Sequence, residues 1–468
     1  MIGAGAGGLT AAAAAAAFGS HVVLIEKGRL GGETLYGGSL PAQALIAAAE
    51  RAQAVRTASR FGVKTVRFGV DFPSVRARVQ EVIAAIEPLD SRQRFTGMGV
   101  RVIEGVARFA DRETVTVNGL AVKAQRFIIA TGSSPELPAI PGLADAPYLT
   151  SANVFDLDEC PRHLIVIGAG PPAIEMAQAF RRLGAEVTVL NEASPLAGFD
   201  GECAALVIDA LVRDGVALHA GVKIGQVRRA LARVQVDIAS DAGTETIEGS
   251  HILVASGRRP NVADLDLARA GVRYEAGGIV VDKRLLTSNK SVYAIGDVID
   301  APKWTQPGTH VAQHHAGLVI RHALFRTQVK ADSYAVPWVT FTDPQMAQVG
   351  MIEEAARATR QAFRILRWPY SENERAQATG ETRGHIKVVA DREGGILGVT
   401  LVGAQAAENI AVWTLAINQR LNIEALAGVI VPYPTYSEVG KRAAMTYFNR
   451  GLTSPLVRRI IGWLRRFG

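Results

Sequence analysis

The chain has 468 residues with a formal net charge of +7, and 48% of its residues are apolar while 20% are charged. This length exceeds what a single hydrophobic core usually supports, so we expect two or three globular domains and no disordered chain. The arginines and lysines are spread along the sequence, apart from a cluster at the C-terminus, and this argues against nucleic-acid binding.

Cysteine usage and hydropathy argue against a disulfide-rich, a cysteine-ligated metal-binding and a membrane-spanning protein. Two cysteines, Cys160 and Cys203, permit neither a disulfide framework nor a paired-cysteine metal site within one chain, so no metal is predicted. No basic leader precedes the apolar N-terminal run, and no later stretch reaches the ~18 uncharged apolar residues of a membrane span. We therefore expect a cytoplasmic protein.

The first predicted elements are a glycine turn, a helix and a strand. Gly3, Gly5 and Gly8 form a G-x-G-x-x-G motif, and the strand "HVVLIEK" carries Glu26 near its end. A carboxylate about 20 residues after the glycines can bind ribose hydroxyls, while the helix N-terminus holds a pyrophosphate. Two residues precede Gly3, whereas such a strand usually has about five or six. Either the natural start lies upstream or a central strand has been shortened, and we favour the first because a shortened strand leaves neighbouring backbone groups unpaired.

A second glycine turn lies in "HLIVIGAGPPAIEMAQAFRRLGAEVTVLNEA". Gly168, Gly170 and Ala173 follow a strand of buried type and open a helix, and the next strand ends at Asn191. Strand, turn, helix and strand in this order predict a second dinucleotide site. A carboxylate at the strand end favours NAD, and a nearby arginine favours NADP. Because Glu192 would repel a 2′-phosphate and "NEASPLAGFD" holds no Arg or Lys, we predict NADH over NADPH.

The last predicted helix lies in "LTSPLVRRIIGWLRRFG". At 100° per residue its apolar side chains share one side and its arginines the other. The apolar set is Leu456, Val457, Ile460, Trp463, Leu464 and Phe467, and the basic set is Arg458, Arg459, Arg465 and Arg466. Two interpretations stay open: the helix packs on its own dimer, or the segment 452–467 docks reversibly on an anionic membrane.

The two glycine motifs, together with six further motifs in order along the chain, carry a resemblance to a known family. The further motifs are "GGETLYGGSLPAQALI", "FIIATGSSPELPAIPG", "LVASGRRPN", "VYAIGDV", "PWVTFTDPQMAQVG" and "VPYPTYSEVGKRAA". From Gly3 to about Tyr447 the chain resembles the class I pyridine nucleotide-disulfide oxidoreductases, the flavoproteins that include dihydrolipoamide dehydrogenase, mercuric reductase, glutathione reductase and the soluble transhydrogenases.

The resemblance implies an α/β fold with two Rossmann-like dinucleotide-binding domains, for FAD and NAD(P), and a C-terminal α+β dimerisation domain. The implied limits are 1–150 and 266–334 for the FAD domain, 151–265 for the NAD(P) domain, 335–450 for the dimerisation domain and 451–468 for the basic helix. A homodimer follows, in which each active site borrows residues from the partner subunit.

The resemblance also implies cofactor-binding residues. For FAD these are the first glycine turn, Glu26, Lys27, Thr131, Gly132, Gly296 and Asp297. For the nicotinamide nucleotide they are the second glycine turn, Asn191, Glu192 and Gly257. Asp297 is expected at this place on independent grounds, because "VYAIGDV" reads as a short buried strand whose carboxyl end faces the ligand crevice of a parallel sheet.

The segment "GGETLYGGSLPAQALI" departs from the family pattern. Disulfide-reducing members carry a cysteine pair at the positions of Thr34 and Ser39, and no hydroxyl can cycle between thiolate and disulfide. We expect both Cys160 and Cys203 to lie too far from the flavin to replace that pair.

Four further candidate catalytic positions accompany this change, two of them departures from the family pattern and two of them retained. Gln43 stands where the family has a lysine, its glutamate partner remains as Glu175, and the C-terminal His-Glu dyad is represented by Tyr433 and Glu438. The resemblance therefore implies an FAD-dependent NAD(P)H oxidoreductase that reduces a non-disulfide acceptor: a quinone, a dye, a metal complex, oxygen or a second nicotinamide. The alternative is a catalytically inactive flavin-binding scaffold or redox sensor.

Overall fold

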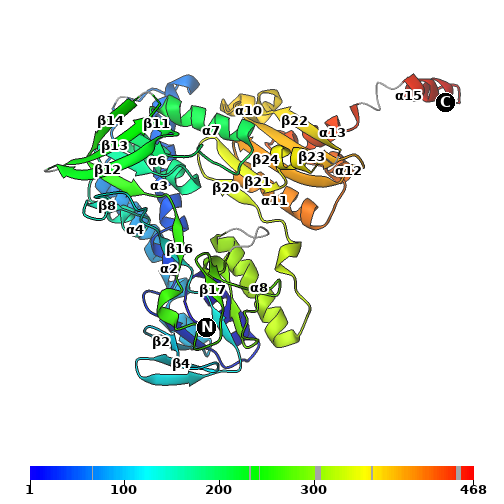
Figure 1. Cartoon of the computed structure of the whole chain (residues 1–468). Coiled ribbons are helices and arrows are strands. Elements are labelled where there is room, and N and C mark those ends of the chain that lie inside the picture. The colour runs from blue at the N-terminus through cyan, green and yellow to red at the C-terminus, as the bar shows by residue number, and fades with distance from the viewer. Residues whose placement is uncertain are drawn as a thin grey trace. The chain divides into compact units, whose positions relative to one another are not determined.

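The computed structural model describes residues 1–65, 67–230, 233–241, 243–300, 307–359, 362–449 and 455–467. The chain divides into two compact units (Figure 1). The nucleotide unit comprises Met1–Ala193 and Gly215–Tyr334, and the C-terminal unit comprises Ser194–Asp214 and Ala335–Gly468.

A parallel sheet forms the first half of the nucleotide unit. Its strands are β1 (Val23–Glu26), β2 (Arg101–Glu104), β6 (Phe127–Ile129) and β19 (Val292–Ala294). β1 pairs with β2, and β6 pairs with β19. Ile2 joins the two pairs, since it bridges in parallel to both Ile25 and Ile129. The backbone before the first glycine turn therefore lies in the central position of this sheet.

Apolar side chains hold helices against this sheet. The helices of this half are α1 (Ala6–Ala17), α2 (Gly32–Tyr36), α3 (Ser39–Thr57), α4 (Phe72–Ile86), α5 (Arg92–Gly97) and α8 (Thr309–Phe325). An antiparallel sheet is made by β3 (Arg108–Phe109), β4 (Thr114–Val117) and β5 (Leu120–Lys123). α1 packs against α8, and a Cβ at Gly7 of α1 would lie 3.2 Å from Ala312 of α8, so the two helices approach each other closely.

A second parallel sheet has the strand order β11-β10-β9-β15-β8. These strands are β8 (Tyr148–Leu149), β9 (His163–Ile167), β10 (Glu186–Asn191), β11 (Ala217–Ala220) and β15 (His251–Val254), with α6 (Pro171–Leu183) between β9 and β10. An antiparallel sheet is added by β12 (Lys223–Ala230), β13 (Arg233–Ser240) and β14 (Gly243–Gly249). β7 (Ser133–Pro135) pairs with β16 (Arg258–Pro260) and links the two halves of the unit. Further short strands of this unit are β17 (Tyr274–Glu275) and β18 (Gly278–Ile279).

The C-terminal unit is built on an antiparallel sheet of strand order β20-β21-β24-β23-β22. The strands are β20 (Trp338–Thr340), β21 (Gln345–Gly350), β22 (Phe363–Pro369), β23 (His385–Asp391) and β24 (Ile396–Gly403). The helices are α7 (Gly201–Asp214), α9 (Glu353–Ala358), α10 (Glu374–Thr379), α11 (Ala406–Asn418), α12 (Ile423–Gly428), α13 (Glu438–Thr446) and α15 (Pro455–Leu464). The buried rings of Tyr370 and Trp413 anchor its apolar core.

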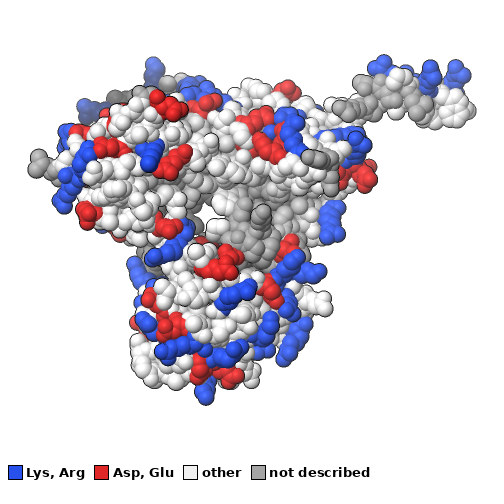
Figure 2. Space-filling model, in the orientation of Figure 1, with Lys and Arg blue, Asp and Glu red and all other residues white. Residues whose placement is uncertain are grey.

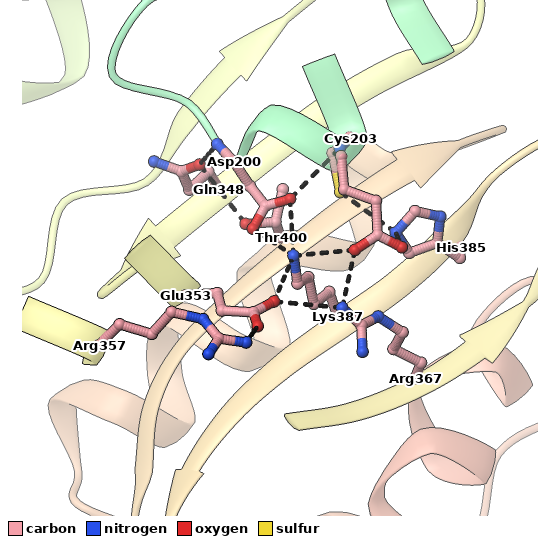
Figure 3. Close-up of polar contacts among 10 residues, drawn as sticks. Asp200, Cys203, Gln348, Glu353, Arg357, Arg367, His385, Lys387 and Thr400 are labelled. Carbon is pink, nitrogen blue, oxygen red and sulfur yellow. Dashed lines mark hydrogen bonds and ion pairs between the residues drawn. The ribbon is translucent and has the colours of Figure 1, made fainter. Parts of the chain in front are cut away.

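A buried cluster of charges joins α7 and α9 to this sheet (Figure 3). The ammonium of Lys387 on β23 lies 2.8 Å from Asp200, 3.0 Å from Glu202 and 2.7 Å from Glu353. The side chain of Lys387 is 3% exposed, and that of Asp200 is 1% exposed. Three carboxylates therefore surround one buried cation, and Arg367 adds a second cation by contacting both Glu202 and Glu353.

The C-terminal helix α15 exposes a broad apolar surface. Ile460, Trp463 and Leu464 of α15 are 48%, 57% and 53% exposed, and Phe467, just after the helix, is 73% exposed. Basic side chains project from this C-terminal segment in Figure 2. Residues 451–454, where the predicted C-terminal segment begins, lie outside the described residues. Among the residues that the structure describes, none of the helices combines the length and apolarity needed to span a membrane.

Candidate functional site

The first glycine turn forms a cradle at the N-terminus of α1. Gly3 has a φ of +98°, and a Cβ at Gly8 would overlap the carbonyl oxygen of Gly3, so strand and helix approach each other too closely for side chains. A Cβ at Gly5, in contrast, would meet no described atom within 4 Å. Close packing behind the turn and open space at Gly5, in front of the free amides of a helix N-terminus, fit a pyrophosphate.

Glu26 closes the same region from the end of β1. Its carboxylate accepts hydrogen bonds from the amides of Ala4, at 2.6 Å, and Gly28, at 2.8 Å. A carboxylate offers about four acceptor positions, so capacity remains for the hydroxyls of a ribose. Lys27, the next residue, is exposed.

The second glycine turn repeats this geometry. Gly168 has a φ of +116°, and a Cβ there would lie 2.5 Å from the carbonyl oxygen of Ala255. A Cβ at Gly170 would meet no described atom within 4 Å, and Ala173 is fully buried. The residues present therefore fit a second dinucleotide.

The end of β10 and the segment after β15 lie at the same sheet edge as the second turn. Asn191 donates from its side-chain amide to the carbonyl of Ala193 at 2.8 Å, and Glu192 is exposed. Gly257 follows β15, the strand that pairs with β9. Parallel strands therefore place these predicted residues at one edge, as ligand sites of such sheets require.

Asp297 lies just beyond the carboxyl end of β19, beside the end of β6. It accepts hydrogen bonds from the hydroxyl of Ser133 and from the amide of Gly308, both at 2.9 Å. Thr131 and Gly132 follow β6, and Asn261 holds this segment in place. The hydroxyl of Thr131 donates to the backbone carbonyl of Asn261 at 2.8 Å, and the side-chain amide of Asn261 donates to the backbone carbonyl of Thr131 at 2.9 Å. Two neighbouring parallel strands thus bring the predicted flavin-binding residues together.

His315 accepts a hydrogen bond from the backbone of Gly296, the residue before Asp297. The amide of Gly296 donates to Nδ1 of His315 at 3.3 Å. Burial and the neighbouring His314 lower the pKa of His315 to about 4, so the imidazole is neutral at physiological pH and Nδ1 can act as an acceptor. The turn that carries Asp297 therefore rests on an uncharged side chain.

Three hydroxyl groups meet at the two positions, Thr34 and Ser39, that the sequence analysis predicts to be catalytic. Thr34 on α2 lies 3.0 Å, oxygen to oxygen, from Thr309 at the start of α8, and Ser39 at the start of α3 lies 3.4 Å from Thr309. Thr309 therefore joins the two positions by hydrogen bonds. We call Thr34, Ser39 and Thr309 the hydroxyl cluster.

Glu33, next to Thr34, is held by a bidentate ion pair. Arg258 on β16 donates from one terminal nitrogen to Oε1 of Glu33 at 2.7 Å and from the other to Oε2. The hydroxyl of Ser151 also donates to Oε1, at 2.6 Å. Arg258 donates from Nε to the hydroxyl of Ser133 at 2.8 Å, the same hydroxyl that donates to Asp297.

These contacts close on themselves. Chain neighbours Glu33 and Thr34 connect the ion pair to the hydroxyl cluster, and chain neighbours Gly308 and Thr309 connect that cluster back to Asp297. We call this closed set the polar ring. Its members are Glu33, Thr34, Ser133, Arg258, Asp297, Gly308 and Thr309.

The remaining predicted catalytic residues lie further along the chain. Gln43 is on α3 and the buried Glu175 on α6, two helices that pack against each other. Tyr433 and Glu438 lie in the C-terminal unit, where Tyr433 is 70% exposed. Glu438 begins α13, and its Oε2 is buried without a hydrogen-bond partner among the described residues. A buried carboxylate oxygen of this kind is costly unless another group binds it.

The two cysteines are separate free thiols. Cys160 is half-buried in the nucleotide unit, and Cys203 is buried in the C-terminal unit, 3.5 Å from Nε2 of His385. Burial raises the pKa of both thiols, so neither is a thiolate at neutral pH.

Sequence reasoning missed five members of the polar ring: Glu33, Ser133, Arg258, Gly308 and Thr309. Glu33, Ser133 and Arg258 lie inside motifs that the sequence displays, yet their pairing joins positions 225 and 125 residues apart. A carboxylate directly before Thr34 and an arginine directly after Gly257 were the signals that could have indicated an ion pair.

Known proteins agree with this architecture. The sequence model of the pyridine nucleotide-disulphide oxidoreductases matches residues 1–317, and that of their dimerisation domain matches residues 336–444. The mercuric reductase of Lysinibacillus sphaericus is 33% identical over 450 residues, which are 96% of this chain and 82% of that protein. The dihydrolipoyl dehydrogenase of Thermus scotoductus is 36% identical over 452 residues, 94% of each chain.

A solved structure extends the comparison. The HOCl-induced flavoprotein disulfide reductase RclA from Escherichia coli superposes with a TM-score of 0.84 at 27% identity, covering 95% of this chain and 98% of that one. RclA has also been solved as a Cu(II) complex. The two glycine cradles, the C-terminal unit and these matches lead to one conclusion: the chain belongs to the pyridine nucleotide-disulphide oxidoreductase family, whose members are FAD- and NAD(P)-dependent oxidoreductases with a C-terminal dimerisation domain.

Proposed function

We propose that the protein is an NAD(P)H oxidoreductase that delivers electrons through FAD directly to a non-disulfide acceptor. The observation that supports this proposal is the hydroxyl cluster, whose Thr34 and Ser39 we assign, from the sequence resemblance, to the positions of the family's cysteine pair. Hydroxyl groups have no thiolate-disulfide couple. FAD, when bound, supplies the redox chemistry by taking a hydride from the nicotinamide and releasing electrons to the acceptor.

The residues around the flavin take positioning roles in this proposal. The hydroxyl cluster lines the acceptor side and offers hydrogen-bond donors. In this proposal Glu175 lies beside the nicotinamide and the flavin, and Gln43 offers a hydrogen-bonding side chain near it. In the homodimer, Tyr433 and Glu438 of the partner subunit line the acceptor side, and the unpartnered Oε2 of Glu438 supports a role in binding another group.

The cofactor-binding roles follow the two cradles. Glu26 and Lys27 take the adenosine ribose of FAD, Thr131 and Gly132 lie beside the flavin nucleotide, and Asp297 binds the ribityl chain. The nicotinamide nucleotide binds at the second cradle, together with Asn191, Glu192 and Gly257. We propose NADH as the preferred donor, because the exposed carboxylate of Glu192 would repel a 2′-phosphate.

We propose a small-molecule electron acceptor from five classes: a quinone, a dye, a metal complex, oxygen or a second nicotinamide. The Cu(II) complex of RclA supports the inclusion of a metal complex. The proposed domain limits are those expected from the sequence, with the FAD domain interrupted by the NAD(P) domain.

Anaerobic titration of the yellow protein tests the proposal. NADH is expected to bleach the flavin absorbance rapidly and NADPH more slowly, with no thiolate–flavin charge-transfer band, because no thiol lies in the hydroxyl cluster. Multiple-turnover assays with NADH and either lipoamide or Hg(II) are expected to show no activity above a protein-free control. Failure of both nucleotides to bleach the flavin would instead support a flavin-binding scaffold, and robust lipoamide or Hg(II) turnover would refute the non-disulfide acceptor.

We also propose that the segment 452–467 makes a peripheral contact with anionic membranes. Apolar side chains of α15 are about half exposed. Arg458 and Arg459 lie on the helix, and Arg465 and Arg466 follow directly after it. This combination is typical of segments that lie in a lipid interface. Basic residues near an anionic surface contribute about 1 kcal/mol each, and salt screens this attraction.

Liposome flotation tests the membrane contact. The full-length protein is expected to float with phosphatidylglycerol vesicles at low salt, to float weakly at high salt and not to float with phosphatidylcholine vesicles. Replacing Arg458, Arg459, Arg465 and Arg466 together with glutamine is expected to abolish flotation while leaving the flavin spectrum unchanged. Absence of flotation at low salt would favour packing of α15 on its own dimer.

A further inference from the structure

Arg258 uses all three of its guanidinium nitrogens within the polar ring. Besides the two bonds to Glu33 and the bond from Nε to the Ser133 hydroxyl, one terminal nitrogen donates to the Ser133 carbonyl at 2.8 Å. Nε also lies 4.0 Å from Oδ2 of Asp297. The guanidinium is therefore fixed between the carboxylate next to the hydroxyl cluster and the carboxylate at the end of β19.

The charges in this region do not cancel. Glu33 and Asp297 carry two negative charges, and within the described parts of the chain Arg258 is the one cation within 4.0 Å of either carboxylate. The side chains of Glu33 and Asp297 are 31% and 21% exposed, so water screens them incompletely. FAD brings a negatively charged pyrophosphate to the first cradle, and reduction of a flavin adds further electron density to its ring.

We propose that Arg258 is the charge-balancing positioning residue of the flavin site, and that its pairing with Glu33 determines how tightly FAD is held and how readily it is reduced. This inference rests on the proposed function to the extent that it places the flavin beside Asp297. A fixed cation stabilises anionic cofactors and the added charge of a reduced flavin. Loss of Arg258 leaves two carboxylates facing the site. We therefore expect that loss to weaken FAD binding and to make reduction of the flavin less favourable.

A double-mutant cycle separates this role from simple packing. Arg258→Met removes the cation and leaves Glu33 ionised, whereas Arg258→Met combined with Glu33→Gln removes one charge of each sign. If Arg258 acts by charge, the double variant recovers FAD affinity that the single variant has lost. If Arg258 acts by packing and hydrogen bonding, the second substitution removes further contacts and the loss persists or grows.

The experiment measures the FAD dissociation constant and the two-electron midpoint potential of the full-length protein. Arg258→Met is expected to weaken FAD binding about tenfold or more, since tenfold corresponds to the modest loss expected for one charged contact, and to make the midpoint potential more negative. Arg258→Lys retains the charge without the bidentate geometry and is expected to be intermediate. The double variant is expected to return toward the wild type in both quantities.

Arg259→Met is the matched control, because Arg259 is the adjacent exposed residue on β16 and lies outside the polar ring. Its FAD affinity and potential are expected to equal those of the wild type. Wild-type values in Arg258→Met, or a double variant no better than the single one, would overturn the inference. Because bleaching of the wild-type flavin by NADH is measured separately, failure of the proposed function would leave this test of Arg258 intact. Should Arg258→Met fail to fold, Arg258→Lys and Glu33→Gln still test it: unchanged potentials in both would count against the role of the pair.

Discussion

Replacing Lys387 with methionine is expected to lower the free energy of unfolding by about 3–5 kcal/mol, the cost of leaving a buried ion pair without one partner. The ammonium of Lys387 is surrounded by Asp200, Glu202 and Glu353, and the side chains of Asp200 and Glu353 are 1% and 9% exposed. Methionine fills the volume of the side chain but supplies no charge. Asp200 would then lose the ammonium that pairs with it, while Glu353 would keep its contacts with Arg357 and Arg367. The ion pairs that link Asp200, Glu202 and Glu353 to Lys387 of β23 would all be lost.

The pH dependence of stability gives this prediction a second readout. Burial opposes ionisation of Glu202, but hydrogen bonds from Arg367 and Lys387 outweigh it and lower the pKa of Glu202 to about 2. Burial likewise opposes ionisation of Glu353, and hydrogen bonds from Lys387 and Arg357 lower its pKa. Depressed carboxylate pKa values stabilise the folded state above the usual value of 4.5 and lose this effect as the pH falls toward about 2. Without Lys387 the carboxylates protonate more easily, so the difference between variant and wild type should narrow on acidification.

Urea denaturation of both proteins at pH 7 and at about pH 4, within the window in which carboxylates titrate, measures these effects. Arg357→Met is the matched control, since Arg357 also contacts Glu353 but its side chain is 68% exposed. Pairs exposed to this extent contribute about 0–1 kcal/mol. Equal stabilities of Lys387→Met and Arg357→Met would show that the buried cluster does not hold this unit together.

Gly5→Ala is expected to weaken FAD binding about 10- to 100-fold, which corresponds to the 1–3 kcal/mol cost of placing a methyl group into occupied space. The added Cβ meets no described atom of the protein within 4 Å, so the free protein should fold and keep its stability. Gly170→Ala makes the same change in the second cradle. That variant is expected to retain FAD and to require a similarly higher NADH concentration for bleaching.

FAD retention after desalting and the NADH dependence of bleaching distinguish the two variants. Gly317→Ala serves as control, because Gly317 lies on α8 and its Cβ would likewise meet no described atom within 4 Å, while alanine is the better helix former. The assignment of the cradles would be wrong if Gly5→Ala held FAD normally, or if Gly170→Ala lost FAD and bound NADH normally.

Local sequence patterns predicted the fold class and both cradles because their chemistry is local. A glycine turn between a buried strand and a helix needs residues within a few positions of each other, and the open faces of Gly5 and Gly170 follow from the backbone of the turn itself. Asp297 was predictable for a related reason, since a carboxylate at the end of a buried parallel strand faces the ligand edge.

The long-range ion pairs and hydroxyl contacts were not predictable from such patterns. Lys387 and Asp200 are 187 positions apart, and Thr34 and Thr309 are 275 apart. The sequence singled out Thr34 but not its contact with Thr309, and it did not distinguish Lys387 or Asp200 from solvated surface residues, because charge and hydroxyl content carry no record of which segment packs nearby.

The sequence by itself therefore determined the two dinucleotide folds and the family, and it places the hydroxyl residues Thr34 and Ser39 in the segment that we propose as the acceptor side. The tertiary structure alone decided that Thr309 bridges those two positions and that Arg258 pairs with Glu33. It also decided that Lys387 is a buried cation. The physical reason is that hydrogen bonds and ion pairs act over about 3–4 Å, and only the folded chain brings such distant segments to that separation.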